Sequence, residues 1–171
     1  MSTYYLAIQQ FARSLRLLDG VLTKAEAHAK ARNFDVNVFL TSKLAPDMFP
    51  FVRQVRIACD NAKNLAAALA GKDAPKHEDN EQTFEELHGR IAKALAFVES
   101  VTDADVAKRK GDDVVKMPNR PGKGMKADEY LWVRQVPNFY FHVVTAYAIL
   151  RAGGVDVGKT DYIGTYDMVD L

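Results

Sequence analysis

Apolar residues that recur at steps of three or four constrain the fold of this chain more than any other feature. Within residues 3–31 these positions are Tyr5, Ile8, Ala12, Leu15, Leu18, Leu22, Ala25 and Ala29. An α-helix brings positions with this spacing onto one face, and a mean step of about 3.5 residues is typical of helical bundles. The pattern therefore predicts a long amphipathic helix over residues 3–31.

Two further segments repeat the pattern. Residues 48–70 carry it at Phe51, Val55, Ala58, Ala62, Leu65 and Leu69, and residues 84–98 at Phe84, Leu87, Ile91, Ala94 and Val98. We expect Asp47 to cap the start of the 48–70 helix and Gly71 to end it. Thr83 and Glu86 have the spacing of a capping box at the start of the next helix. These signals predict a second and a third helix.

The polar side of the 48–70 helix carries Arg53, Arg56, Asp60 and Lys63. Charged residues opposite an apolar stripe predict a solvated helix face. Arg56 and Asp60 are four residues apart, and we expect them to form an ion pair on that surface.

A fourth helix is predicted from about residue 128 to residue 151, ending at Gly153 and Gly154. Pro137 lacks an N–H group and clashes with the preceding turn, so it predicts either a kink or a fresh helix start.

The segment DVVKMPNRPGKGMKA before this helix favours a two-stranded ribbon or an ordered loop. We also expect one or two extra helical turns within DVNVFLTSKL, and a tail after Gly154 that lies extended against the bundle.

These elements predict the fold class: an all-α four-helix bundle with a short ribbon or loop inserted between the third and fourth helices. The length of 171 residues predicts one domain spanning residues 1–171.

Composition indicates which kinds of partner and which cellular compartment to expect. The chain has 23 Lys and Arg against 22 Asp and Glu, and a formal net charge of +1, which argues against a nucleic-acid-binding protein. The single cysteine, Cys59, excludes an intramolecular disulfide and fits a reducing compartment. The N-terminal residues do not resemble a signal peptide, and no apolar stretch is long enough to span a membrane. We therefore expect a cytoplasmic protein that binds neither nucleic acid nor membranes.

Residues 153–160, GGVDVGKT, match the phosphate-binding pattern G-x-x-x-x-G-K-[ST]. A working phosphate loop needs a strand before the glycines and a helix after the threonine. Here the preceding residues, AYAILRAGG, are the end of a predicted helix. We interpret the match as a helix C-terminus followed by a tail.

The most apolar segment, residues 138–150, places its polar side chains on one narrow face. At 100° per residue Asn138, His142 and Thr145 fall together, and Gln135 joins them if the helix continues back through Pro137. Three interpretations stay open: a water-exposed side of a mostly buried helix, a small polar cavity between helices, or a satisfied core histidine without function. We favour the cavity, because surface stripes usually carry Lys and Glu and because bundles commonly build sites between their helices.

His142 is the residue of this stripe that can move a proton or bind a metal near neutral pH. The amide oxygen of Asn138 is a poor ligand for Zn²⁺ or Ni²⁺. On the 48–70 helix, Gln54, Cys59 and Asp60 are candidates to face the cavity, although Cys59 is better explained as a small buried apolar residue. The sequence thus predicts His142 as the catalytic candidate, no metal ligands, and a ligand-binding set formed by Asn138, His142, Thr145, Gln135 and Gln54.

The chain resembles the DinB/YfiT-like superfamily of metalloenzymes, and within it an uncharacterised branch of unknown function. The resemblance lies in KAEAHA (24–29), LAPDMFPFVRQVRIACDNAK (44–63), TFEELHGRIAKALAFVES (83–100), PNFYFHVVTAYAILRAGG (137–154) and VGKTDYIG (157–164). It implies up-down-down-up connectivity and a homodimer. It also implies a divalent metal held by one histidine of the second helix and a His-x-x-x-His pair on the fourth. Some members use this metal to activate a low-molecular-weight thiol in transferase or isomerase chemistry.

This sequence departs from the metal-binding pattern of the superfamily. The His-x-x-x-His pair appears as Asn138-x-x-x-His142, and the 48–70 helix contains no histidine. We expect the metal to be lost, with no cofactor, rather than replaced by an unusual set such as His142, Gln54 and carboxylates.

The expected function is small-molecule binding in a cavity centred on His142, in a degenerate relative of the metal- and thiol-dependent transferases. His142 would act there as a general base or a hydrogen-bond donor. Whether the protein is an enzyme stays open. The alternative is a non-catalytic structural or stress-associated homodimer, with the fourth helix or the tail forming the interface.

Overall fold

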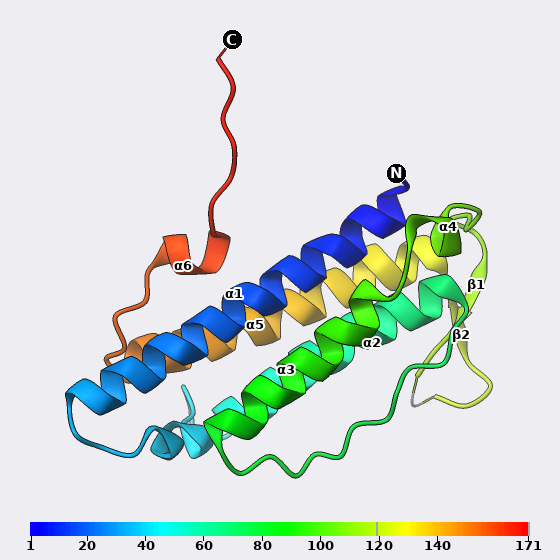
Figure 1. The fold of residues 1–171 in the computed structure, drawn as a ribbon. Coiled ribbons are helices and arrows are strands. Elements are labelled where there is room, and N and C mark those ends of the chain that lie inside the picture. The colour runs from blue at the N-terminus through cyan, green and yellow to red at the C-terminus, as the bar shows by residue number, and fades with distance from the viewer. Residues whose placement is uncertain (119, 171) are drawn as a thin grey trace.

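Four long helices form the body of the molecule in the computed structural model, which describes residues 1–118 and 120–170 (Figure 1). They are α1 (Thr3–Ala31), α2 (Phe51–Ala70), α3 (Phe84–Glu99) and α5 (Val136–Ala152). Helices α2 and α3 run in one direction, and α1 and α5 run in the other. This arrangement confirms the predicted all-α bundle with up-down-down-up connectivity.

The predicted apolar stripes form the core. The stripe positions of α2 and α3 are at most 1% exposed, and those of α1 are at most 2% exposed except for the partly buried Tyr5. Thr83 and Glu86 form the predicted capping box of α3. Helix α2 ends at Gly71, whose φ of +67° lies in the left-handed region that glycine adopts without a steric penalty.

The predicted cap of α2 is wrong. The N-cap residue is Pro50 rather than Asp47, and the carbonyl of Pro50 accepts the first helical hydrogen bonds, from the backbone N–H groups of Arg53 and Gln54. A proline disfavours the helical conformation of the residue before it, so the helix cannot extend back through Phe49.

Shorter elements connect the long helices. They are η1 (Val36–Thr41), α4 (Asp103–Val106), the antiparallel strands β1 (Val114–Lys116) and β2 (Gly124–Lys126), η2 (Glu129–Gln135) and α6 (Lys159–Ile163). The 3₁₀ helix η1 and the ribbon of β1 and β2 confirm the predictions for their segments. None of the described helices is long and apolar enough to cross a membrane.

The last helix continues through Pro137 without a fresh start. The π-helical stretch η2 runs directly into α5, with Gln135 and Val136 in helical conformation, so the helix accommodates the missing N–H of Pro137 by a local π-helical distortion. Gly153 caps the end of α5, which confirms that GGVDVGKT begins at a helix C-terminus. The expectation of an extended tail is wrong for residues 159–163, because they form the short helix α6 beside α1.

The connection between α2 and α3 must return along the length of the bundle, because these two helices are parallel (Figure 1). Residues 72–83 are mostly exposed, but Glu81 is only 9% exposed. An extended chain of this length spans about 40 Å, enough to pass a 20-residue helix of about 30 Å.

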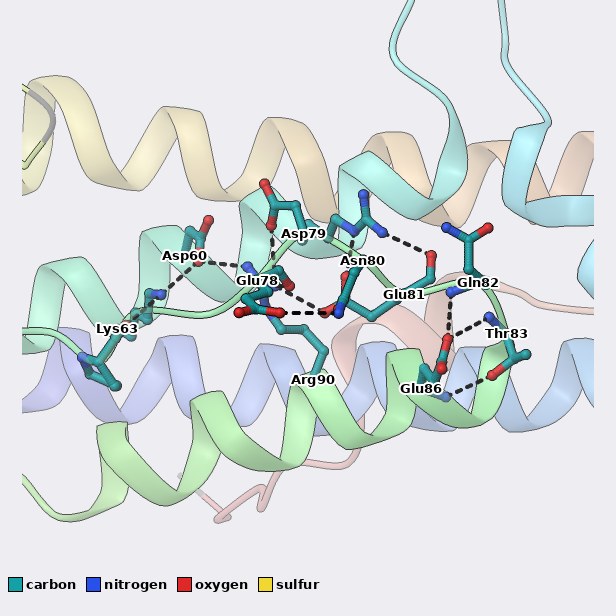
Figure 2. A network of polar contacts seen from close by, with 12 residues as sticks. Asp60, Lys63, Glu78, Asp79, Asn80, Glu81, Gln82, Thr83, Glu86 and Arg90 are labelled. Atoms are coloured by element: carbon teal, nitrogen blue, oxygen red, sulfur yellow. Dashed lines mark hydrogen bonds and ion pairs between the residues drawn. The ribbon is translucent and has the colours of Figure 1, made fainter.

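Arg90 of α3 holds this connection in place (Figure 2). Its side chain is 1% exposed, and its guanidinium lies 2.9 Å from Asp60 Oδ1, 2.9 Å from Glu81 Oε1 and 3.2 Å from Asp79 Oδ1. It also donates to the carbonyl of Glu78 at 3.0 Å. The guanidinium thus ties α2, α3 and the connection together.

Two residues of α2 complete this ionic network, and they correct the predicted solvated face. Arg56 binds Glu81 rather than Asp60, and donates to the Glu81 carbonyl at 2.8 Å. Lys63 is buried and binds Asp60 Oδ1 at 2.9 Å and the carbonyl of Pro75 at 2.8 Å. The connection folds over this side of α2 and covers it. Glu81 therefore takes the place of Asp60 as the partner of Arg56.

We predict that Arg90→Met will lower the free energy of unfolding by about 3 kcal/mol, because it removes the buried guanidinium that pairs with both Glu81 and Asp60 and leaves Glu81 with Arg56 alone. Asp79→Asn is the matched control, since that side chain is 64% exposed and contributes little. Urea unfolding of both variants is the measurement. Equal stability losses in the two variants would contradict the role given to the buried guanidinium.

Candidate functional site

Polar side chains line the contact between α2 and α5, two helices that pack extensively against each other. We call this contact the polar seam. Its members are Gln54 and Asn61 from α2, Gln135 at the end of η2, and Asn138, His142 and Thr145 from α5.

The centre of the polar seam is a hydrogen bond between Gln54 and His142. Oε1 of Gln54 lies 2.7 Å from Nδ1 of His142, and the two residues are 1% and 6% exposed. Nε2 of Gln54 donates to the carbonyl of Phe49 at 2.9 Å, which leaves the amide oxygen facing the ring. An amide oxygen only accepts hydrogen bonds, so this network assigns the proton of His142 to Nδ1. Nε2 of His142 therefore carries a lone pair.

The surroundings keep the imidazole of His142 neutral. Burial lowers its pKa to about 4, and the positive charge of Arg53 acts in the same direction. The Arg53 guanidinium lies 3.6 Å from the centroid of the Phe49 ring, and the ring of Phe141 meets His142 edge to face with centroids 5.2 Å apart. At neutral pH, His142 is thus an uncharged group with one fixed tautomer.

A second amide pair lies farther along the polar seam. Nδ2 of Asn138 donates to Oδ1 of Asn61 at 3.0 Å, while Nδ2 of Asn61 has no partner among the described residues. Gln135 is fully buried, and neither atom of its amide has a partner in that same part of the chain. The hydroxyl of Thr145 donates to the carbonyl of Phe141 at 2.6 Å within its own helix.

The structure therefore brings Gln54 to His142 and adds Asn61, which sequence reasoning missed. Asn61 follows Gln54 by seven residues, which is two helical turns, so the two residues share a face of α2. That spacing is the signal that could have identified it. Cys59 is fully buried, and burial raises its pKa to about 12. Asp60 lies in the ionic network around Arg90 instead.

A hollow reaches the polar seam at Asn138. It has a volume of about 530 Å³, is largely open to solvent, and is lined by Met125, Val133, Arg134, Pro137 and Asn138. Asn138 is one helical turn before His142, so the hollow opens beside the second amide pair.

The donor set of the polar seam does not fit a divalent metal ion. His142 offers one imidazole nitrogen, and its neighbours in the polar seam, Gln54, Asn61 and Asn138, are amides, which are poor ligands for Zn²⁺ or Ni²⁺. Within residues 1–118 and 120–170, no three His, Cys, Asp or Glu side chains come together in a way that could hold a metal. The polar seam differs in this respect from the three-histidine pattern that the superfamily resemblance implies.

Comparisons with known proteins agree with this architecture. Residues 3–163 match the family model described as a domain of unknown function, DUF1993. A solved structure described as a DinB family member from Shewanella denitrificans superposes with a TM-score of 0.90 and is 42% identical, over 98% of this chain and 95% of that chain. No curated protein matches the chain.

The fold and the relative define a DinB-like helical bundle. Within that class, the chain belongs to the DUF1993 family.

Burial of His142 links the stability of the protein to pH. The imidazole titrates near 6.5 in the unfolded chain and near 4 in the folded one, so between these values the unfolded chain binds the extra proton. Stability is therefore fully present above about pH 6.5 and is lost as the pH falls toward 4, by up to about 3 kcal/mol.

We predict that His142→Gln flattens this part of the pH dependence, because the new side chain does not titrate. Urea unfolding at several pH values between 4 and 8 measures the slope, with His28→Gln at the end of α1 as the matched control. An unchanged slope in His142→Gln would contradict the assignment.

Proposed function

We propose that the polar seam binds a small uncharged polar molecule, which donates a hydrogen bond to Nε2 of His142. The observation that carries this proposal is the fixed tautomer of His142: Gln54 holds Nδ1, and Nε2 has a lone pair without a partner among the described residues. Nε2 of His142 keeps some solvent-accessible surface, so a bound molecule or water can reach this acceptor.

The amides of Gln135 and Asn61 support the same proposal. Three of their side-chain atoms are buried without partners in the described structure, and each such atom costs about 1–3 kcal/mol when it is left unsatisfied. A primary amide or a urea carries the donor and the acceptor that the Gln135 amide lacks. Gln135 lies about 10 Å along the helix from His142, so each place takes its own molecule or one end of a longer ligand. The hollow beside Asn138 supplies a route from solvent.

The ligand is uncharged because the buried side chains of the polar seam are dipoles, and the charge that acts on His142, that of Arg53, lies on an exposed side chain stacked on Phe49. Amides and a neutral imidazole cannot compensate a buried ion, whose desolvation is far more costly than that of a neutral polar group. Lys63 and Asp60, the charged side chains of α2 on its opposite side, are already bound within the ionic network.

We infer binding rather than proton transfer. A pKa of about 4 makes His142 a weak base at neutral pH, whereas efficient general bases titrate near the working pH. His142 accepts a hydrogen bond in this proposal, and the donor role falls to the amides. The protein would then be a relative of the metal- and thiol-dependent transferases that keeps their frame without their metal. Homodimer assembly and a cytoplasmic location stay predictions.

The test is a titration of ¹⁵N-labelled protein with acetamide, urea and glycerol, followed by amide chemical shifts. We expect saturable shifts confined to the residues of α2 and α5 that form the polar seam. His142→Leu keeps an apolar filling and removes the acceptor, and should weaken binding roughly fivefold.

The matched control is His88→Gln, a change on α3 where the imidazole binds Asp19 and Glu26 of α1 instead. It should leave the titration unchanged. Binding that is equally strong in His142→Leu, or shifts that never saturate for any of the three compounds, would overturn the proposal.

A further inference from the structure

An apolar groove lies along the N-terminal half of α1, on a different part of the bundle from the polar seam. It has a volume of about 470 Å³, and its apolar walls include Leu6, Phe11, Trp132, Val136 and Tyr140. Trp132 is 52% exposed and Leu6 is 53% exposed. Large apolar side chains that gather in one exposed groove mark a docking surface.

The C-terminal segment leaves α6 next to this groove. Nη2 of Arg13 donates to the carbonyl of Thr165 at 2.6 Å. A Cβ atom on Gly164, whose φ is +75°, would lie 2.9 Å from both Arg13 and Leu17, so the backbone touches α1 at this point. The docking of α6 on α1 therefore delivers the following residues to the surface of α1.

Beyond this anchor, the chain exposes apolar side chains. Tyr166, Met168 and Val169 are 70%, 85% and 86% exposed, and the tail extends away from the bundle (Figure 1). Residues two apart in an extended chain point to the same side, so Tyr166 and Met168 face one way, and Asp167 and Val169 face the other. The two largest apolar side chains of the tail can therefore cover an apolar surface together.

The anchor and the groove lie on the same face of α1. At 100° per residue, Arg13 and Leu17 share a sector of about 60° with Leu6 and Gln10. Arg13 and Leu6 are seven residues apart, which is about 10 Å along the helix. Four extended residues reach about 13 Å, so residues 166–169 are long enough to lie along the groove.

We propose that residues 166–169 fold back along α1 and cover the apolar groove of the same chain, with Tyr166 and Met168 against Trp132 and Tyr140. An aromatic ring and a thioether are suited to this contact, because both pack favourably on aromatic side chains. Residues 166–169 follow directly after the α6 contact on α1, so they dock on their own chain. The tail then has two positions, one against the groove and one extended away from the bundle, and the structure shows the extended one.

Trp132 is the single tryptophan of the sequence, so its fluorescence reports on the groove alone. In the full chain we expect a covered indole. Removal of residues 166–171 should shift its emission to the red and raise its quenching by acrylamide roughly twofold, since half of the side chain is then exposed. Circular dichroism shows whether the shortened chain keeps its helices.

A double variant, Tyr166→Ser with Met168→Ser, tests the same contact in the full-length chain and should reproduce the effect of the deletion. Asp167→Ser is the matched control on the opposite side of the tail and should leave the emission unchanged. Equal quenching in the parent chain and the double variant would overturn the proposal.

Light scattering and dilution separate the intramolecular arm from a contact between two molecules. We expect the protection of Trp132 to be independent of protein concentration. Protection that disappears on dilution together with a dimer would assign the groove to a second copy of the chain and would also overturn the proposal.

Discussion

The hydrogen bond between Gln54 and His142 joins two extensively packed helices and decides the chemistry of the contact between them. Its geometry begins with Pro50, which makes α2 start after Phe49 and leaves the Phe49 carbonyl outside the helix. That carbonyl accepts from the Gln54 amide and so turns the amide oxygen toward His142. Backbone sterics four residues before Gln54 thus fix the tautomer of an imidazole on another helix.

Two kinds of interaction hold helix α2 in place, neutral hydrogen bonds on one side and ion pairs on the other. On one side, amides and a neutral imidazole pair across a buried contact with α5. On the other, the guanidinium of Arg90 and the ammonium of Lys63 neutralise carboxylates under the long α2–α3 connection (Figure 2). Parallel neighbouring helices require that long connection, and one buried cation from α3 gives it a defined path. The side chains of the first contact are uncharged, whereas the charges of the second are paired with one another.

Local periodicity made much of the fold predictable. The stripes of α1, α2 and α3, the capping box at Thr83 and the stop at Gly71 depend on neighbours within one or two turns, and these predictions are confirmed. The partner of Arg56 was not predictable in this way. Asp60 is one turn away in the sequence, but Glu81 is brought in by a connection whose path depends on the whole bundle.

The same limit applies to the candidate site. Helical geometry places Asn138, His142 and Thr145 on one face. It does not predict which hydrogen-bond partner each residue has. Thr145 is satisfied within its own helix, Asn138 pairs with Asn61, and His142 pairs with Gln54. Which residue of α2 meets each one depends on how the two helices are aligned, and that alignment is set by packing between distant segments.

The most direct test of the central claim is long-range ¹⁵N–¹H NMR of the His142 ring across a pH titration, with and without added Zn²⁺. We expect a proton on Nδ1, a bare Nε2, titration near pH 4 and no change on addition of the metal. A proton on Nε2, titration near the ordinary pKa of about 6.5, or a stoichiometric shift on addition of Zn²⁺ would contradict a neutral imidazole that Gln54 holds for an uncharged ligand.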